Sequence, residues 1–176
     1  MKKIFVFVCI AAVASSCVIV KPGEVGVRQF LGRLKGNTAP PGPTLINPFT
    51  TQLVKIPTRT VNKEIKLNLP SKEGLNVSAE ISILYHVKEE KALDIINEVG
   101  ANFERVLILS TFRSASADVC ARFYAKDMHS GKRAEIEKEI KELMVKLLEN
   151  RGFVIEAVLL KSITLPPGLY CLLYTS

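Results

Sequence analysis

The stretch SKEGLNVSAEISILYHV, residues 71–87, gives the strongest indication of the fold, because apolar and polar side chains alternate along it. From Asn76 to Val87 the alternation has a period of two, which is typical of a strand with one buried and one solvated face. The side chains expected in the core are Val77, Ala79, Ile81, Ile83, Tyr85 and Val87. Residues 72–74 supply the turn before this strand. The pattern predicts an antiparallel sheet with one buried face and one solvent-exposed face.

Shorter β-type stretches precede this strand. They are residues 25–30, 53–56 and 60–69. Residues 32–37 are predicted to form a hairpin turn, because they combine glycine and asparagine with polar neighbours. Pro40, Pro41 and Pro43 exclude a regular central strand in the next segment, since proline cannot donate to a sheet ladder.

After residue 87 the apolar spacing changes to that of helices. The predicted helices are residues 88–99, 102–123 and 132–151, and a strand follows at residues 153–165. The second helix is expected to be rich in small residues, and the apolar and small residues that mark it are Phe103, Val106, Leu107, Leu109 (or Ser110), Ala117, Cys120 and Ala121. The expected apolar stripe of the third helix is Ile136, Ile140, Leu143 and Leu147. Strands first, then helices, then one returning strand predict an α+β fold, a mostly antiparallel sheet with helices packed on one side.

The first twenty residues, MKKIFVFVCIAAVASSCVIV, indicate the cellular compartment of the protein. Two lysines, an apolar run over residues 4–13 and small residues at 14–16 are the parts of a secretory signal. Cys17 follows the small residues directly, as in the lipobox of bacterial lipoproteins, where it would become the lipid-bearing N-terminus. The alternative is an uncleaved membrane span, because residues 4–20 just reach the length that crosses a hydrocarbon core. Both interpretations attach the chain to a membrane.

Composition narrows the class of protein further. Apolar residues make up 48% of the 176 residues and the formal net charge is +7, with alternating signs in runs such as KEIK and KEEK. Such mixing predicts a solvated surface rather than a nucleic-acid interface, and leaves room for a mild attraction to anionic membranes. The four cysteines make no disulfide framework, and Cys120 is predicted to be a buried small apolar residue.

Catalytic and metal-binding patterns are missing from the sequence. Neither His86 nor His129 has a second histidine or a cysteine at ligand spacing. Residues 130–132, SGK, lack the first glycine of a phosphate-binding loop, and Arg133 stands where such a loop needs Ser or Thr. We therefore expect no catalytic residue, no metal and no cofactor.

Several ordered segments resemble the SPFH or band 7 domain of prohibitins, stomatins and flotillins. They are PGEVGVRQFLGRL (22–34), GPTLINPF (42–49), the strand at 71–87, FRSASADV (112–119) and ENRGFVIEAVLLKSITLPPGL (149–169). No single segment would suffice, but their order and spacing extend the resemblance from about residue 20 to residue 169. The closest similarity is to bacterial prohibitin-like proteins.

This resemblance implies a scaffold and not an enzyme. SPFH proteins sit on a membrane through their N-terminus, assemble through a C-terminal coiled coil, and several associate with membrane-bound AAA proteases. The implied partners are membrane lipids, further copies or paralogues in an oligomer, and such a protease, with no nucleic acid. The implied location is the bacterial cell envelope, with the domain outside the cytoplasm.

The expected organisation has three parts. Residues 1–16 form the signal peptide or anchor, and residues 17–169 form the SPFH domain. Residues 171–176, CLLYTS, resemble the translation of a sequencing-library adaptor, so we expect an artefact there and a native coiled coil that is missing.

One segment near the anchor is a candidate interaction surface. Leu45, Ile46, Pro48 and Phe49 place apolar side chains in a predicted loop that could lie against the membrane or fold back onto the sheet edge. The main functional hypothesis is a membrane-anchored scaffold. The alternative is a lipid-binding or envelope-stress accessory module without large assembly. A hydrolase, the third hypothesis, finds no support in the residues.

Overall fold

The computed structural model describes residues 16–47, 49–129 and 131–164, which form two compact units. The first unit contains the described residues up to Arg59 together with Val87–Ala101. The second contains Thr60–His86 together with the described residues from Asn102 onward. The predicted signal residues before Ser16, Pro48 and the predicted artefact at residues 171–176 lie outside the described residues.

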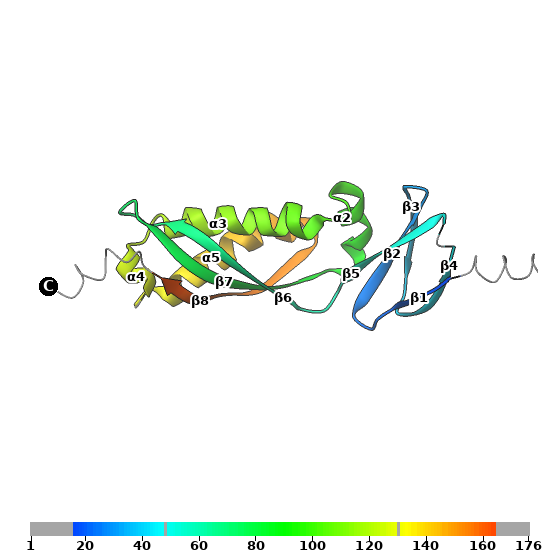
Figure 1. Ribbon diagram of the computed structural model, residues 1–176, viewed down its shortest axis with the longest axis horizontal. Helices are drawn as coiled ribbons and strands as arrows, with labels where there is room; N and C mark the ends of the chain where they lie inside the picture. The colour runs from blue at the N-terminus through cyan, green and yellow to red at the C-terminus, as the bar shows by residue number, and fades with distance from the viewer. Residues whose placement is uncertain (1–15, 48, 130, 165–176) are drawn as a thin grey trace, which may run out of the picture. The chain divides into compact units, whose positions relative to one another are not determined.

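The first unit is built from two small antiparallel sheets and one helix (Figure 1). Its elements are β1 (Ser16–Val20), β2 (Glu24–Phe30), β3 (Arg33–Ala39), β4 (Gly42–Ile46), β5 (Thr51–Pro57), a 3₁₀ turn (Glu89–Lys91) and α2 (Ala92–Glu98). β1 pairs with β4, while β2 lies between β3 and β5. The buried side chains at its centre include Val20, Val25, Val27, Ile56 and Ile95.

The hairpin between β2 and β3 is tighter than the sequence predicted. Its turn is only Leu31 and Gly32, both with positive φ, as in a two-residue type I′ turn. Residues 35–37, which were predicted to belong to the turn, lie in β3. There they form a bulge, with three residues of β3 standing against the single residue Arg28 of β2.

The proline-rich segment contains a strand, which corrects the prediction of a loop for Leu45 and Ile46. Both residues belong to β4, whose one strand partner among the described residues is β1. Pro43 is tolerated because each strand of a two-stranded ribbon has a free edge, where no N–H is needed. The absence of a regular central strand here therefore agrees with the prediction.

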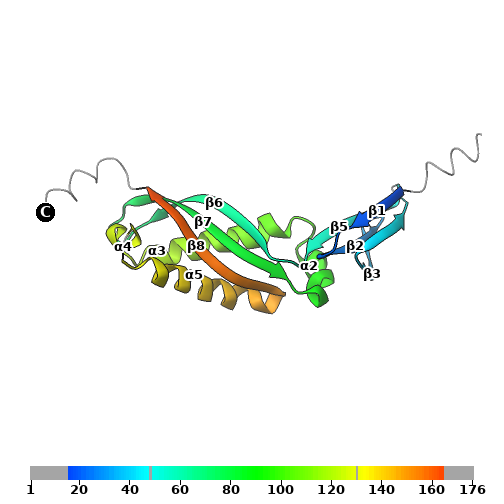
Figure 2. The same cartoon turned by 90° about the horizontal axis from the view of Figure 1, so that it is seen from below.

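The second unit is one three-stranded sheet with helices on one side (Figures 1 and 2). Its elements are β6 (Val61–Pro70), β7 (Asn76–Val87), a π-helical segment (Glu104–Leu109), α3 (Ser110–Cys120), α4 (Ala125–His129), α5 (Arg133–Leu148), a 3₁₀ turn (Glu149–Arg151) and β8 (Phe153–Thr164). The strand order is β6-β7-β8. β6 and β7 are antiparallel, and the contacts His86–Glu156 and Glu80–Ser162 run in opposite order along β7 and β8, so this pair is antiparallel too. The predicted α+β fold is confirmed.

The six side chains of β7 expected in the core, at positions 77 to 87, are all buried. α3 and α5 cover this face of the sheet, as Figure 2 shows, and contribute Phe112, Ile136 and Ile140 to the same core. The opposite face of the sheet carries polar side chains. Ser82, which the alternation placed on the polar face, is buried as well and donates a hydrogen bond to Asn62.

Two helices bury other residues than their apolar spacing marked. Of the residues that marked the second predicted helix, Phe103 is buried but Val106 is exposed, and Ile108, which was not among them, is buried. The cause is the π-helical segment, whose wider turns rotate the following residues relative to an α-helix. In α5 the buried stripe is Ile136, Ile140, Met144 and Leu148, whereas Leu147 is exposed. The stripe follows steps of four residues throughout, as along one ridge of a packed helix.

Candidate functional site

Exposed apolar side chains gather at the turns and outer ribbon of the first unit. Leu45, Phe49 and Leu31 are 77%, 80% and 71% exposed, and Ile19 and Phe30 are exposed as well. We call these five residues the apolar surface. Large apolar side chains that are exposed on one small unit are candidates for a contact with a protein or a membrane.

The β1–β4 ribbon supplies two members of the apolar surface. In its register the backbone of Cys17 stands opposite Leu45, and that of Ile19 stands opposite Pro43. Val20 and Thr44 are buried, so the two exposed side chains, Ile19 and Leu45, belong to the ribbon's other face. The predicted lipid-bearing residue is therefore the cross-strand neighbour of an exposed leucine.

Hydrogen bonds fix the two turns that supply the rest of the apolar surface. The Asn47 side chain accepts a hydrogen bond from the Phe49 backbone at 3.0 Å, and the Asn47 carbonyl accepts one from Thr51 at 2.9 Å. The Leu31 backbone N–H donates to the Thr50 carbonyl at 2.9 Å, which ties the β2–β3 turn to the β4–β5 turn. Phe49 is thus held outward by an Asx-type turn.

Leu31 adopts a backbone conformation that is costly for its residue type. Its φ is +46°, and it is the only residue other than glycine with a positive φ among those described. A residue with a Cβ in the left-handed region costs roughly 1–2 kcal/mol, and asparagine is better tolerated there. A strained and exposed leucine at a turn is a feature that folding alone does not explain.

Of the residues proposed from the sequence, Leu45 and Phe49 are exposed and belong to the apolar surface. Ile46 is half-buried, and Pro48 lies outside the described residues. The Cys17 backbone belongs to β1, while its side chain is outside the described part of the chain. Sequence analysis missed Ile19, Phe30 and Leu31. The signal for Leu31 was the pair Leu31–Gly32, an apolar residue where a tight hairpin favours Asn-Gly.

The net positive charge is distributed unevenly along the chain. Residues 16–59 contain six cations and one carboxylate, whereas residues 60–176 contain sixteen of each. The cations are Lys21, Arg28, Arg33, Lys35, Lys55 and Arg59. Outside the leader, the excess positive charge therefore comes entirely from residues 16–59. The runs of mixed charge, such as KEIK and KEEK, lie in residues 60–176, where cations and carboxylates balance. Basic residues beside apolar ones favour an anionic lipid surface.

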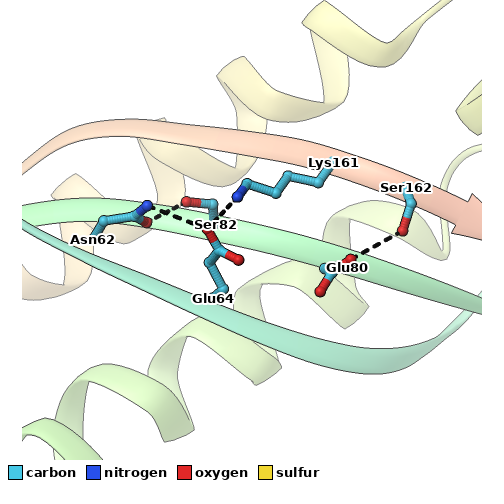
Figure 3. Close-up of polar contacts among 6 residues, drawn as sticks. All are labelled: Asn62, Glu64, Glu80, Ser82, Lys161 and Ser162. Atoms are coloured by element: carbon cyan, nitrogen blue, oxygen red, sulfur yellow. Dashed lines mark hydrogen bonds and ion pairs between the residues drawn. The ribbon is translucent and has the colours of Figure 1, made fainter.

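The open face of the second unit's sheet carries a polar network (Figure 3). Ser82 donates to Asn62, Lys161 pairs with Glu64, and Ser162 donates to Glu80 at 3.4 Å. The hydrogen bond and charge of Lys161 hold the pKa of Glu64 below its usual value. The network joins β6, β7 and β8 across the face that no described helix covers.

A second cluster on this face brings Thr60, His86 and Glu156 together. Thr60 Oγ1 donates to Glu156 Oε1 at 2.7 Å, and His86 Nδ1 lies 2.7 Å from the same oxygen. These two hydrogen bonds hold the pKa of Glu156 below its usual value. Because the hydroxyl and the imidazole share one carboxylate oxygen, the histidine does not accept the hydroxyl proton, and the cluster is no nucleophile–base pair.

Two further observations concern chemistry in the described residues. They contain no group of three histidine, cysteine or acidic side chains placed to hold a metal ion. Cys120 is buried, as predicted, and burial raises the pKa of its thiol to about 12, so it is a structural residue.

Comparison with protein families gives one match. The family model described as SPFH domain / Band 7 family matches residues 18–170. A search of curated proteins finds no match.

Replacing Leu31 by asparagine should stabilise the chain, because asparagine tolerates the left-handed backbone. We expect the L31N variant to gain about 1 kcal/mol in the free energy of unfolding, measured by chemical denaturation. Leu147→Asn is the matched control, since Leu147 is an exposed leucine in a helix with ordinary backbone geometry. Unchanged or lower stability of L31N would show that the left-handed backbone conformation of Leu31 does not cost free energy.

The network on the open sheet face should make stability depend on acid. The pKa of Glu64 is depressed in the folded state, so its stabilising effect is present above the ordinary value of 4.5 and is lost as the pH falls through the folded pKa. Lys161→Met should make the free energy of unfolding fall less steeply between about pH 5 and pH 3. Lys138→Met is the control, because Lys138 forms only a loose 3.9 Å pair with Glu142 on an exposed helix face. Equal pH slopes in the parent and both variants would show that the Glu64–Lys161 pair contributes nothing.

Proposed function

The chain belongs to the SPFH/band 7 family, and on that premise we propose that it is a membrane-anchored scaffold which organises other membrane proteins. Family membership supports a generic prohibitin-like scaffold role. The observation that carries the membrane part of the proposal is the apolar surface, because it joins exposed apolar turns, a strained leucine and a basic segment in one small unit.

We propose that the anchor is a lipid on Cys17. β1 takes residues 16–20 into a sheet, which leaves fewer than the residues 4–20 needed for a minimal span. No helix in the described residues is long and apolar enough to cross a membrane. The pairing of Cys17 with Leu45 supports the lipid anchor, since acyl chains attached there would enter the bilayer beside an exposed apolar side chain. A single N-terminal membrane helix is the alternative anchor.

Acylation would commit the protein to the membrane strongly. Each buried methylene contributes about 0.8 kcal/mol, and one acyl chain alone gives only reversible binding. The apolar surface and the basic residues around it would then add a second attachment, which orients the unit on the bilayer. We place the protein in the bacterial cell envelope with its domain outside the cytoplasm.

The assembly part of the proposal rests on the family alone. We propose that the protein forms a homo-oligomer, or a hetero-oligomer with a paralogue, through a coiled coil that follows the domain, and that a membrane-bound AAA protease is one client. An accessory lipid-binding module that stays small is the competing interpretation.

Metabolic labelling with a fatty acid tests the anchor. The parent chain should incorporate label and lose its leader, whereas Cys17→Ala should carry no label and keep the leader. Cys120→Ala is the matched control, because Cys120 is buried in α3 and should leave labelling unchanged. An unlabelled parent that is processed in the same way as Cys17→Ala would contradict the lipid anchor and favour the membrane helix.

The same membranes test assembly. Chemical cross-linking of the chain extended by the coiled coil of its native gene should give a ladder well beyond a dimer, and this ladder should be lost when the coiled coil is removed. An extended chain that cross-links to nothing larger than a dimer would contradict the scaffold and favour the accessory module.

A further inference from the structure

The two edges of the second unit's sheet are treated differently. At the β8 edge, α5 satisfies backbone groups directly: the Leu160 N–H donates to Glu137 Oε1 at 2.7 Å, and Arg133 donates to the Lys161 carbonyl at 3.1 Å. The other edge is β6, ten residues long, which pairs with β7 in unbroken register. Within the described ranges no strand pairs with its free side. An open edge of this length is a ready template for another strand.

A cleft of about 400 Å³ runs along the second half of this edge. It is lined by four consecutive residues of β6, from Lys66 to Leu69, and by Arg113 and Ala117 of α3. Four residues of strand correspond to about 13 Å, enough to seat the middle of a short extended segment. Upstream, Lys63 pairs with Glu104 at 2.7 Å and links β6 to the π-helical segment.

The positive charge of the cleft favours a partner segment with acidic side chains. Its polar lining contains two cations, Lys66 and Arg113, and no carboxylate. Neither cation forms an ion pair among the described residues. Glu80 stands opposite Lys66 across the strands and accepts a hydrogen bond from Ser162, so Arg113 has the less compensated charge.

From these features we propose that the β6 edge is a docking site for an extended acidic segment of a partner protein, which adds a fourth strand to the sheet. Its backbone would pair with residues 66–69 of β6, which supplies affinity that is independent of sequence. Alternate side chains would point toward α3, where Ala117 leaves room and Arg113 binds a carboxylate, and toward the open face beside Lys66. The site is distinct from the apolar surface and does not depend on the membrane anchor.

Fluorescence anisotropy with the full chain in detergent micelles tests the proposal. The probe is a labelled, capped peptide of about seven residues, TVEVDVT, and its basic counterpart TVKVKVT is the comparison. We expect the acidic peptide to bind, salt to weaken it, and Arg113→Glu to reduce its affinity about tenfold or more. Arg105→Glu is the matched control, because Arg105 is an exposed cation of the preceding π-helical segment and does not line the cleft.

Hydrogen exchange gives the second readout, since a strand that docks by backbone pairing must protect amides of β6. Protection of β6 amides by the acidic peptide is the expected result. Equal binding of the two peptides, an equal loss with Arg105→Glu, or protection confined to β8 would overturn the proposal. Protection of β6 that grows with protein concentration in the absence of peptide would also overturn it, because the occupant would then be a second copy of the chain.

Discussion

The antiparallel pairing of β6 with β7 is the constraint on which the second unit depends. It runs without interruption from Val61–Tyr85 to Pro70–Asn76, so a slip of one residue would turn every buried side chain of β7 to solvent. Because α3 and α5 fill only one face, the other face must be polar, and side chains from all three strands hydrogen-bond across it. The same one-sided cover leaves the β6 edge without a strand partner among the described residues, which is why the cleft beside α3 exists.

The first unit is organised by a different requirement. Turns usually carry polar residues, yet its turns present Leu31 and Phe49 to solvent and hold them there with backbone hydrogen bonds. Leu31 does so in a backbone conformation that costs a leucine free energy in water, and burial against lipid would offset that cost. Residues 16–59 contain six cations and one carboxylate, and the segment Val87–Ala101 of the same unit contains two cations and four carboxylates, so this unit outside the leader has a net charge of +3. Exposed apolar turns are the feature that the proposed contact of this unit with a membrane requires.

What could be predicted from the sequence was whatever depends on local periodicity. The period-two pattern of residues 76–87 predicted both the strand and its six buried side chains, and the order of elements predicted an α+β fold. The positions of Leu45 and Leu31 depend on pairing with other segments. Leu45 lies in a strand because β4 pairs with β1. Leu31 lies in a two-residue turn because residues 35–37 form a bulge in β3 opposite the single residue Arg28 of β2. The burial of Ile108 in place of Val106 follows from a π-helical segment, which apolar spacing read at 3.6 residues per turn does not reveal. The excess of cations in residues 16–59 could be counted from the sequence, but the sequence did not show that these residues share a unit with the more acidic segment Val87–Ala101.

Membrane contact by the apolar surface is the central claim, and the lack of tryptophan in the chain makes it directly measurable. Phe49→Trp would place a single tryptophan in this surface, and Leu159→Trp would place one at an exposed leucine of β8 outside it. The full chain would be reconstituted in vesicles of phosphatidylcholine and phosphatidylglycerol with brominated acyl chains, which quench tryptophan on contact. If the apolar surface lies against the bilayer, Trp at position 49 will be strongly quenched and its emission shifted to the blue, well beyond Trp at position 159. Equal, weak quenching at both positions would contradict membrane contact by this surface, whatever anchors the chain.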